Sequence, residues 1–277
     1  MNPQHWPMLG SSVLLLVLAL VSSAYAARLP RVHHRIAVIA HRGGTALAPE
    51  NTLAAFRRAI ELGVDYVEID VRVTKDGRFV LMHDRTVDRT TNGFGTVADL
   101  DFEALRALDA GSKFSPRFAG EKVPTLDEAL ALCHKRVSIY LDHKDGPIAA
   151  IWETIRKHRM QRQVVVYDGL DECREWKRLA PQLPVMVSPD DEFRLPGGCA
   201  RLKQVLPVEV LDGNVIEWTK EMVQEAHANG MTVYVDNLGL LDNPQGFRAA
   251  LAMGVDGIQT DHPDQLLEVL KQTRTEP

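Results

Sequence analysis

The stretch YVEIDVRVTKDGRFVLMHD, residues 66–84, decides the fold, because it holds two apolar runs with only a short polar segment between them. Parallel strands need a crossover of about a dozen residues or more, and the five residues 74–78 are too few. The two runs are therefore predicted to form an antiparallel hairpin around Asp76-Gly77, a dipeptide typical of tight turns. A turn centred near Asp76 predicts that His83 faces Ile69, although a slip of one residue would move His83 to the other face.

Short apolar runs alternate with longer amphipathic segments along the rest of the chain, which is the pattern of β/α units. Helices are expected at residues 52–62, 126–133 and 220–228. The expected strands are residues 37–40, 66–73, 79–83, 137–142, 164–168, 184–187, 205–211, 231–235 and 257–260. This is one strand more than a barrel needs. Because only one member of the hairpin joins the parallel set, we predict an α/β fold of the TIM (β/α)8 barrel type.

The composition is that of an ordinary globular enzyme, with 45% hydrophobic and 25% charged residues in a chain of 277. A formal net charge of −5 argues against a nucleic-acid partner. The chain has only three cysteines, Cys133, Cys173 and Cys199, and no Cys-x-x-Cys pair. A disulfide framework and a structural zinc ribbon are therefore not expected.

The N-terminal residues 1–26 read as a signal peptide. The apolar run from Val13 to Val21 is too short to span a bilayer, and Ala24-Tyr25-Ala26 is a small-x-small cleavage pattern. Residues 27–277 then form one domain of about 250 residues, the usual size of a TIM barrel. Export to the periplasm or medium is expected. Because Arg28 follows the run and no Lys or Arg precedes it, an uncleaved membrane anchor is the alternative.

Three carboxylates are candidates for a metal site. Glu68 and Asp70 are two residues apart and share one face of their strand. Asp142 ends the run 137–142, and TIM barrels keep their active sites at the carboxyl ends of strands. Three carboxylates with waters suit Mg2+ or Ca2+. Each acid taken alone has a structural reading, Glu68 at a solvent-facing edge and Asp142 as a loop cap.

Two histidines and two cations accompany these acids. His41 and His83 both follow expected strands, where imidazoles can accept and donate protons near neutral pH. Arg42 offers a planar fork for phosphate, and Lys144 points to the same side of its strand as Asp142. Metal and cations together indicate an anionic substrate. The alternative is that each histidine has only a structural role at the end of its strand and that Arg42 is a surface charge.

Taken together, these residues resemble the glycerophosphodiester phosphodiesterase family, over about residues 37–265. The matching blocks are His41-Arg42-Gly43, Pro49-Glu50-Asn51-Thr52, Glu68-x-Asp70, Thr74-Lys75-Asp76-Gly77, His83-Asp84, Arg89-Thr90-Thr91-x-Gly93, Val123-Pro124-Thr125-Leu126, Asp142-x-Lys144, Gly254-Val255-Asp256-Gly257-Ile258 and Thr260-Asp261-x-Pro263. The order and spacing of so many blocks make this resemblance more specific than any single motif.

The resemblance implies a TIM barrel with a small insertion at about residues 85–122. It implies hydrolysis of a phosphodiester such as glycerophosphocholine or glycerophosphoethanolamine, a small-molecule substrate, and it implies no protein partner. By this resemblance His41 and His83 are acid and base, in an order left open, and Glu50 in the first loop supports the site or contacts substrate. Glu68, Asp70 and Asp142 hold the divalent cation, while Arg42 and Lys144 contact the phosphate.

Three departures from the family pattern leave the alcohol of the substrate open. Asp142 stands where a glutamate is common. The Trp-Thr-Val-Asn block reads Tyr234-Val235-Asp236-Asn237, so Tyr234 is expected as a smaller aromatic wall and Asp236 as an additional acid. Tyr167-Asp168 replaces a Ser-Phe pair.

Two other functions stay open beside this one. The first is a lysophospholipase D-like or cyclising enzyme that acts on a membrane lipid. The second is a non-catalytic protein that binds phosphodiesters. A zinc amidohydrolase barrel is discounted, because residues 164–168 and 184–187 contain no histidine.

Overall fold

The computed structural model describes residues 27–275. The predicted signal peptide at residues 1–26 lies outside the described residues, so export stays a prediction. No helix of the described part is long and apolar enough to cross a membrane.

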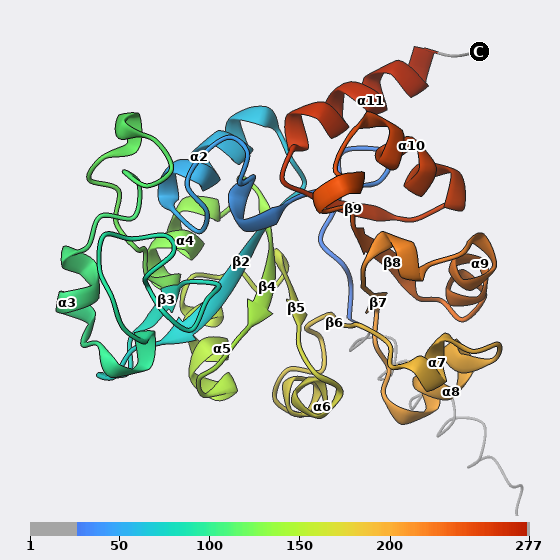
Figure 1. Ribbon diagram of the computed structural model, residues 1–277. Coiled ribbons are helices and arrows are strands. Elements are labelled where there is room, and N and C mark those ends of the chain that lie inside the picture. Colours follow the sequence, from blue (N-terminus) through green and yellow to red (C-terminus); the bar gives the residue numbers. More distant parts are fainter. Residues whose placement is uncertain (1–26, 276–277) are drawn as a thin grey trace, which may run out of the picture.

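Within residues 27–275, eight parallel strands close into a barrel, which confirms the predicted α/β TIM-barrel fold (Figure 1). The barrel closes because β1 pairs with both β2 and β9. Its strands are β1 (Ala37–Ala40), β2 (Tyr66–Val73), β4 (Ser138–His143), β5 (Val164–Tyr167), β6 (Val185–Val187), β7 (Val210–Leu211), β8 (Thr232–Asp236) and β9 (Gly257–Thr260).

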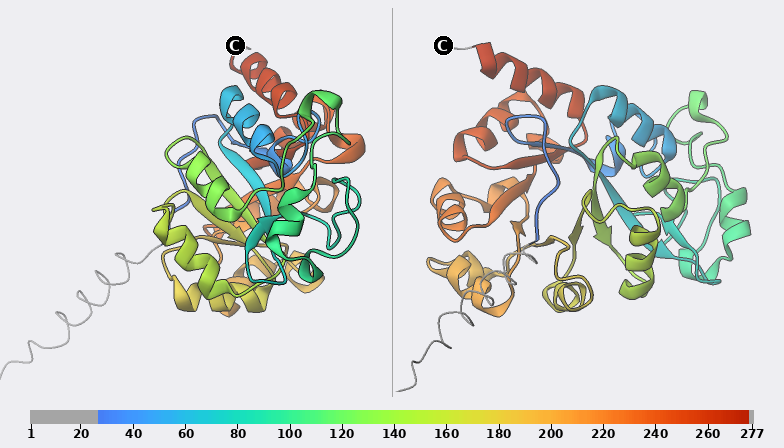
Figure 2. Two further views of the ribbon diagram at one scale, coloured as in Figure 1. Left: turned by 90° about the vertical axis from the view of Figure 1, so that its left-hand side faces the viewer. Right: turned by 180° about the vertical axis from the view of Figure 1, so that it is seen from behind.

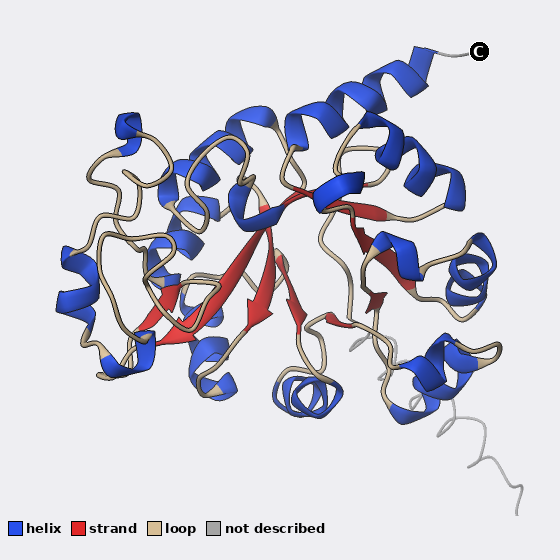
Figure 3. Ribbon diagram, viewed as in Figure 1, coloured by secondary structure: helices blue, strands red, loops and turns tan. Residues whose placement is uncertain are grey.

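Helices surround the strands, as Figure 3 shows in blue and red. Local signals explain where they begin: the Thr125 side chain accepts from the backbone of Glu128, and the Glu128 side chain accepts from the backbone of Thr125, a capping box that starts α4. The helices between or after barrel strands are α2 (Leu53–Leu62), α4 (Leu126–Cys133), α5 (Ile148–Lys157), α6 (Leu170–Leu179), α7 (Asp191–Arg194), α8 (Gly198–Val205), α9 (Lys220–Ala228), α10 (Pro244–Met253) and α11 (Pro263–Thr275).

The hairpin has the predicted register. Strand β3 (Phe79–Leu81) runs antiparallel to β2, with Val73 opposite Phe79 and Val71 opposite Leu81. Gly77 in the turn has a φ of 82°, a conformation that glycine adopts without steric cost. Because β1 pairs only with the first residues of β2, β3 occupies the free edge along the second half of that strand.

The segment after the hairpin lies outside the barrel, as Figures 1 and 2 show. It contains α3 (Phe102–Ala107) and corresponds to the predicted insertion at about residues 85–122. The segment has its own apolar cluster, which includes Val87, Val97 and Leu105 and which packs against Val80 of β3. The hairpin thus connects this small cluster to the barrel.

One predicted strand is wrong at its start. Residues 205–211 were expected to be extended, but α8 continues to Val205 and β7 comprises only Val210–Leu211. The helix buries Cys199 and Leu202, so it packs on the barrel as an amphipathic element. It ends there because Leu206 precedes Pro207, and a residue before proline favours an extended backbone.

Inward-facing side chains fill the barrel in layers. The lower layer is apolar and aromatic: Ala37, Ile39, Tyr66, Tyr140, Val165, Met186, Val210 and Tyr234. Because side chains alternate along a strand, the inward residues two positions further on form the next layer, at the carboxyl ends of the strands. That layer is polar and contains His41, Glu68, Asp142, Tyr167, Asp212 and Asp236. The packed lower layer is therefore the floor of a polar pocket.

Candidate active site

A cavity of about 260 Å3 opens at the carboxyl ends of the barrel strands. Seven of the nine predicted site residues line it: His41, Arg42, Glu68, Asp70, His83, Asp142 and Lys144. Glu50 and Tyr234 do not. The seven come from β2, from β4 and from the segments that follow β1, β3 and β4, so barrel closure assembles them.

The three predicted metal ligands meet on adjacent strands. Asp70 of β2 is the register partner of Asp142 of β4, and carboxylate oxygens of Glu68, Asp70 and Asp142 lie within 4.8 Å of one another. Burial, together with the charges of Asp70 and Asp142, raises the pKa of Glu68 well above its usual value. Three carboxylates gathered in this way, two of them buried, favour a bound cation. Their oxygen atoms are the kind of ligand that Mg2+ and Ca2+ prefer.

Lys144 and Arg42 neutralise part of this negative charge. Lys144 Nζ lies 2.6 Å from Asp142 Oδ2 and 3.1 Å from Asp70 Oδ1. The backbone N–H of Arg42 donates to Glu68 Oε2 at 2.7 Å, and Arg42 Nη1 donates to Glu50 Oε1 at 3.0 Å. Glu50 therefore holds the Arg42 guanidinium at the edge of the pocket from behind.

Arg42 has a left-handed backbone, with φ at 50°. A non-glycine residue pays a steric penalty in this region, so the conformation points to a functional constraint. Glycine is needed at the next position because the turn packs closely on α2: a Cβ on Gly43 would lie 2.6 Å from Ala55 Cβ. The close approach of this turn to α2 aims the Arg42 N–H at Glu68.

Each histidine of the pocket is held by a carboxylate. His41 Nδ1 lies 2.7 Å from Asp261 Oδ1, and His83 Nδ1 lies 2.8 Å from Asp84 Oδ1. A carboxylate at Nδ1 favours the tautomer that has its proton there, which leaves Nε2 as the acceptor. Hydrogen bonds from Arg89, followed by that of His83, hold the pKa of Asp84 far below its usual value. Both imidazoles are thus held in a defined tautomer with Nε2 free to accept a hydrogen bond.

A family model described as the glycerophosphoryl diester phosphodiesterase family matches residues 41–265. The chain belongs to this family. A glycerophosphodiester phosphodiesterase from Caldanaerobacter subterraneus is 35% identical over 243 residues, which cover 85% of this chain and 98% of the relative.

Solved structures of the family have the same architecture. A glycerophosphodiester phosphodiesterase from Agrobacterium tumefaciens matches with a TM-score of 0.73 and 29% identity, covering 84% of this chain and 99% of the other. A phosphodiesterase from Oleispira antarctica, in complex with the product sn-glycerol-3-phosphate, matches with a TM-score of 0.77 and 26% identity. That match covers 84% of this chain and 96% of the other.

Several residues that support the pocket were given no role in the sequence analysis. Asn51 Nδ2 donates to Asp70 Oδ2 at 2.7 Å, and Asn51 Oδ1 accepts from the backbone of Asp70 at 3.2 Å. Arg89 bridges Glu50 and Asp84, and Asp261 orients His41. All three lie in the sequence blocks of the family resemblance, which was the signal available for finding them.

Tyr234 is not brought to the pocket. Its side chain points inward from β8 but lies one layer below the rim, is 2% exposed, and donates to the Tyr66 hydroxyl at 3.4 Å. A Cβ on Gly257 would come within 2.4 Å of the Tyr234 ring, so the ring fills the space beside β9. The expected substrate contact is therefore corrected to a core position, and Asp236 takes the place at the rim.

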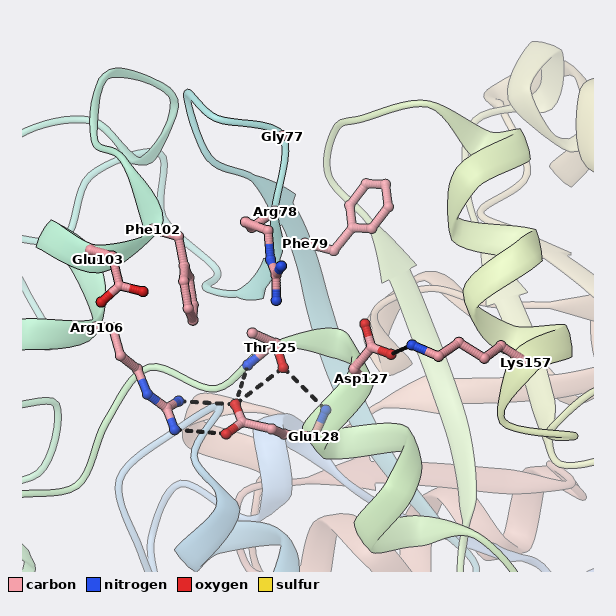
Figure 4. A pocket seen from close by; sticks show the side chains of 10 residues that line it. All are labelled: Gly77, Arg78, Phe79, Phe102, Glu103, Arg106, Thr125, Asp127, Glu128 and Lys157. Atoms are coloured by element: carbon pink, nitrogen blue, oxygen red, sulfur yellow. Dashed lines mark hydrogen bonds and ion pairs between the residues drawn. The ribbon is translucent and has the colours of Figure 1, made fainter.

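A larger groove lies outside the barrel, between the hairpin turn, α3 and α4 (Figure 4). Four of its charged side chains form ion pairs. Arg106 Nη2 lies 2.6 Å from Glu128 Oε1, and Lys157 Nζ lies 2.7 Å from Asp127 Oδ1. None of the predicted site residues lines this groove, so the polar pocket is the candidate active site of the family member.

Proposed function

We propose that this protein hydrolyses glycerophosphodiesters to glycerol 3-phosphate and an alcohol, by acid–base catalysis that depends on a divalent cation. The observation that carries the proposal is that three carboxylates, two histidines and two cations line one small pocket. The names of the relatives and the product bound to the Oleispira antarctica phosphodiesterase support the choice of substrate.

Glu68, Asp70 and Asp142 would hold Mg2+ or Ca2+ in this proposal. When bound, the cation would neutralise phosphate charge that grows in the transition state. The protein contributes the orientation of its ligands: Asn51 fixes Asp70, and the Arg42 backbone N–H fixes Glu68. Lys144 and the Arg42 guanidinium are placed to attract and orient the anionic diester.

The two histidines would divide the proton transfers between them. One imidazole accepts the proton of the attacking oxygen at Nε2, and the other donates a proton to the departing alcohol. The carboxylates of Asp261 and Asp84 at Nδ1 orient each ring and fix its tautomer, so that Nε2 is the atom that exchanges the proton. The same division serves if the attacker is water. If the free hydroxyl of the glycerol attacks, the alcohol leaves and a cyclic phosphate forms, which water then opens to glycerol 3-phosphate with the same two histidines.

Turnover by purified protein tests the proposal. Glycerophosphocholine and glycerophosphoethanolamine should release glycerol 3-phosphate, a chelator should abolish the reaction, and Mg2+ or Ca2+ should restore it. His41→Ala and His83→Ala should each lower turnover by roughly 10^2–10^4-fold. His227→Ala is the matched control, because His227 lies on α9 and pairs with Asp256 away from the pocket.

Four results would contradict the proposal. Full activity after chelation would show that no divalent cation is required. Near-normal rates in both histidine variants would show that His41 and His83 are not the acid and base. Faster cleavage of lysophosphatidylcholine assayed alongside would favour the lipid-directed alternative. Binding of the diesters without any release of glycerol 3-phosphate would favour the non-catalytic alternative.

A further inference from the structure

A second pair of acids, Asp212 and Asp236, lines the same pocket as the three predicted metal ligands. Asp212 follows β7, and Asp236 ends β8, so both stand at the carboxyl ends of neighbouring strands. Asp212 is 2% exposed and accepts a hydrogen bond from the Tyr140 hydroxyl at 3.2 Å. Gln259 Nε2 donates to Asp236 Oδ1 at 2.6 Å.

Two buried acceptors beside this pair have no partner in the described part of the protein, one on Asp212 and one on the amide of Gln259. In the part of the chain that the structure describes, Asp212 Oδ1 and Gln259 Oε1 are buried and have no hydrogen-bond partner. A buried carboxylate oxygen without a partner is costly, so it calls for a donor or a cation from outside the protein. The two cationic side chains of the pocket are paired with other acids. Arg42 donates to Glu50, and Lys144 pairs with Asp70 and Asp142.

The charge of the pocket points to a cation. Five carboxylates line it, against the two permanent cations Arg42 and Lys144. With all five ionised, the two cations, a divalent metal ion and a singly charged phosphodiester together still leave the pocket negative. Burial, and next the charge of Asp236, raises the pKa of Asp212 well above its usual value. Ionisation of this pair is therefore unfavourable until positive charge arrives.

Two aromatic rings complete this side of the pocket. Tyr140 and Tyr167 both line it, with ring centroids 5.9 Å apart. The faces of aromatic rings attract cations, including ammonium groups. Carboxylates beside tyrosine rings thus offer the chemistry that recognises an ammonium group.

We propose that Asp212 and Asp236 form a subsite that binds the cationic alcohol of the substrate, a primary ammonium or a trimethylammonium. The proposal rests on the proposed function and names the class of diester that the pocket selects. A diester of ethanolamine or choline is preferred over a diester of a neutral polyol.

The test compares a cationic and a neutral substrate in matched variants. kcat/KM is measured for glycerophosphoethanolamine, glycerophosphocholine and glycerophosphoglycerol. In Asp212→Asn and Asp236→Asn, the ratio of cationic to neutral kcat/KM should fall by roughly 10- to 100-fold, because each variant removes a carboxylate charge that attracts the ammonium group. Asp171→Asn, on the outer helix α6, removes an exposed charge and should leave the ratio unchanged. Thermal unfolding checks that each variant is folded.

The outcomes separate this inference from the proposed function. An unchanged ratio in both folded pocket variants would overturn the cationic subsite. An equal loss for all three substrates would overturn it too, because the acids would then bind the glycerol that the substrates share. If no diester is hydrolysed, calorimetric binding of glycerophosphoethanolamine and glycerophosphoglycerol gives the same comparison. Selective binding that Asp212→Asn abolishes would support the subsite although the proposed hydrolysis failed.

Discussion

At the scale of single residues, His41 depends on the carboxylate that holds it. Asp261 Oδ1 lies 2.7 Å from His41 Nδ1. In Asp261→Asn the amide no longer fixes the Nδ1-protonated tautomer of His41 and permits the other tautomer. We expect kcat to fall by roughly 10- to 1000-fold while KM changes little. Steady-state kinetics with glycerophosphocholine measures both constants, and Asp171→Asn is the control. A kcat within twofold of the wild type would show that Asp261 does not position the base or acid.

Asn51 supports the proposed metal site in the same way. It makes two hydrogen bonds to Asp70, one to the side chain and one to the backbone. Partners of metal ligands commonly contribute about 10- to 100-fold to affinity, so Asn51→Ala should weaken Ca2+ or Mn2+ binding by that factor. Calorimetric titration measures the affinity without need of turnover. Asn229→Ala, at the end of α9, is the matched control, and equal affinity in both variants would contradict the role of Asn51.

At the scale of elements, local signals in the sequence were sufficient where they are strong. The loop between Val73 and Phe79 is too short for a crossover, so the hairpin and its register could be predicted. Alternation along β2 likewise placed Glu68 and Asp70 on one face. The layer in which an inward side chain lies depends on barrel stagger, which no local pattern contains. Tyr234 was therefore placed one layer too high, and the unpartnered oxygen of Asp212 was not foreseen.

Strand β4 also has an outward histidine whose charge affects stability. His143 Nδ1 lies 2.6 Å from Asp168 Oδ2, behind the pocket. Burial acts to lower the pKa of His143, but the Asp168 hydrogen bond and charge outweigh it and the pKa is raised from 6.5. The protonated form therefore stabilises the fold. This contribution is complete below the unfolded value and is lost as pH rises through the folded pKa.

Chemical denaturation across pH measures this effect. The difference in unfolding free energy between the wild type and His143→Gln should shrink as pH rises from about 6 to about 9. In an Asp168→Asn background the same difference should depend much less on pH, because the partner charge is gone. A difference that is constant with pH in the wild-type background would show that His143 is not charged by Asp168.

At the scale of the whole molecule, the site exists because the barrel closes. Parallel strands end at one rim, so residues as distant in sequence as His41 and Asp142 line one cavity, and Asp261 contacts His41 there. The layer beneath the rim supplies the apolar and aromatic packing of the barrel interior, so the rim itself can carry polar side chains. Stability and chemistry are thus assigned to successive layers of the same strands, which is the general arrangement of TIM barrels.

Tyr234 tests this separation of layers. Its ring packs edge-on against Tyr66, with centroids 6.0 Å apart, and fills the space that Gly257 leaves open. Tyr234→Ala should lower the free energy of unfolding by about 3–5 kcal/mol, as truncation of a buried aromatic ring does. Tyr234→Phe keeps the ring and should leave KM for glycerophosphocholine within about twofold of the wild type, because its hydroxyl contacts Tyr66 and not the cavity. Urea unfolding and steady-state kinetics measure the two effects. A large rise in KM for Tyr234→Phe with unchanged stability would return Tyr234 to the substrate site.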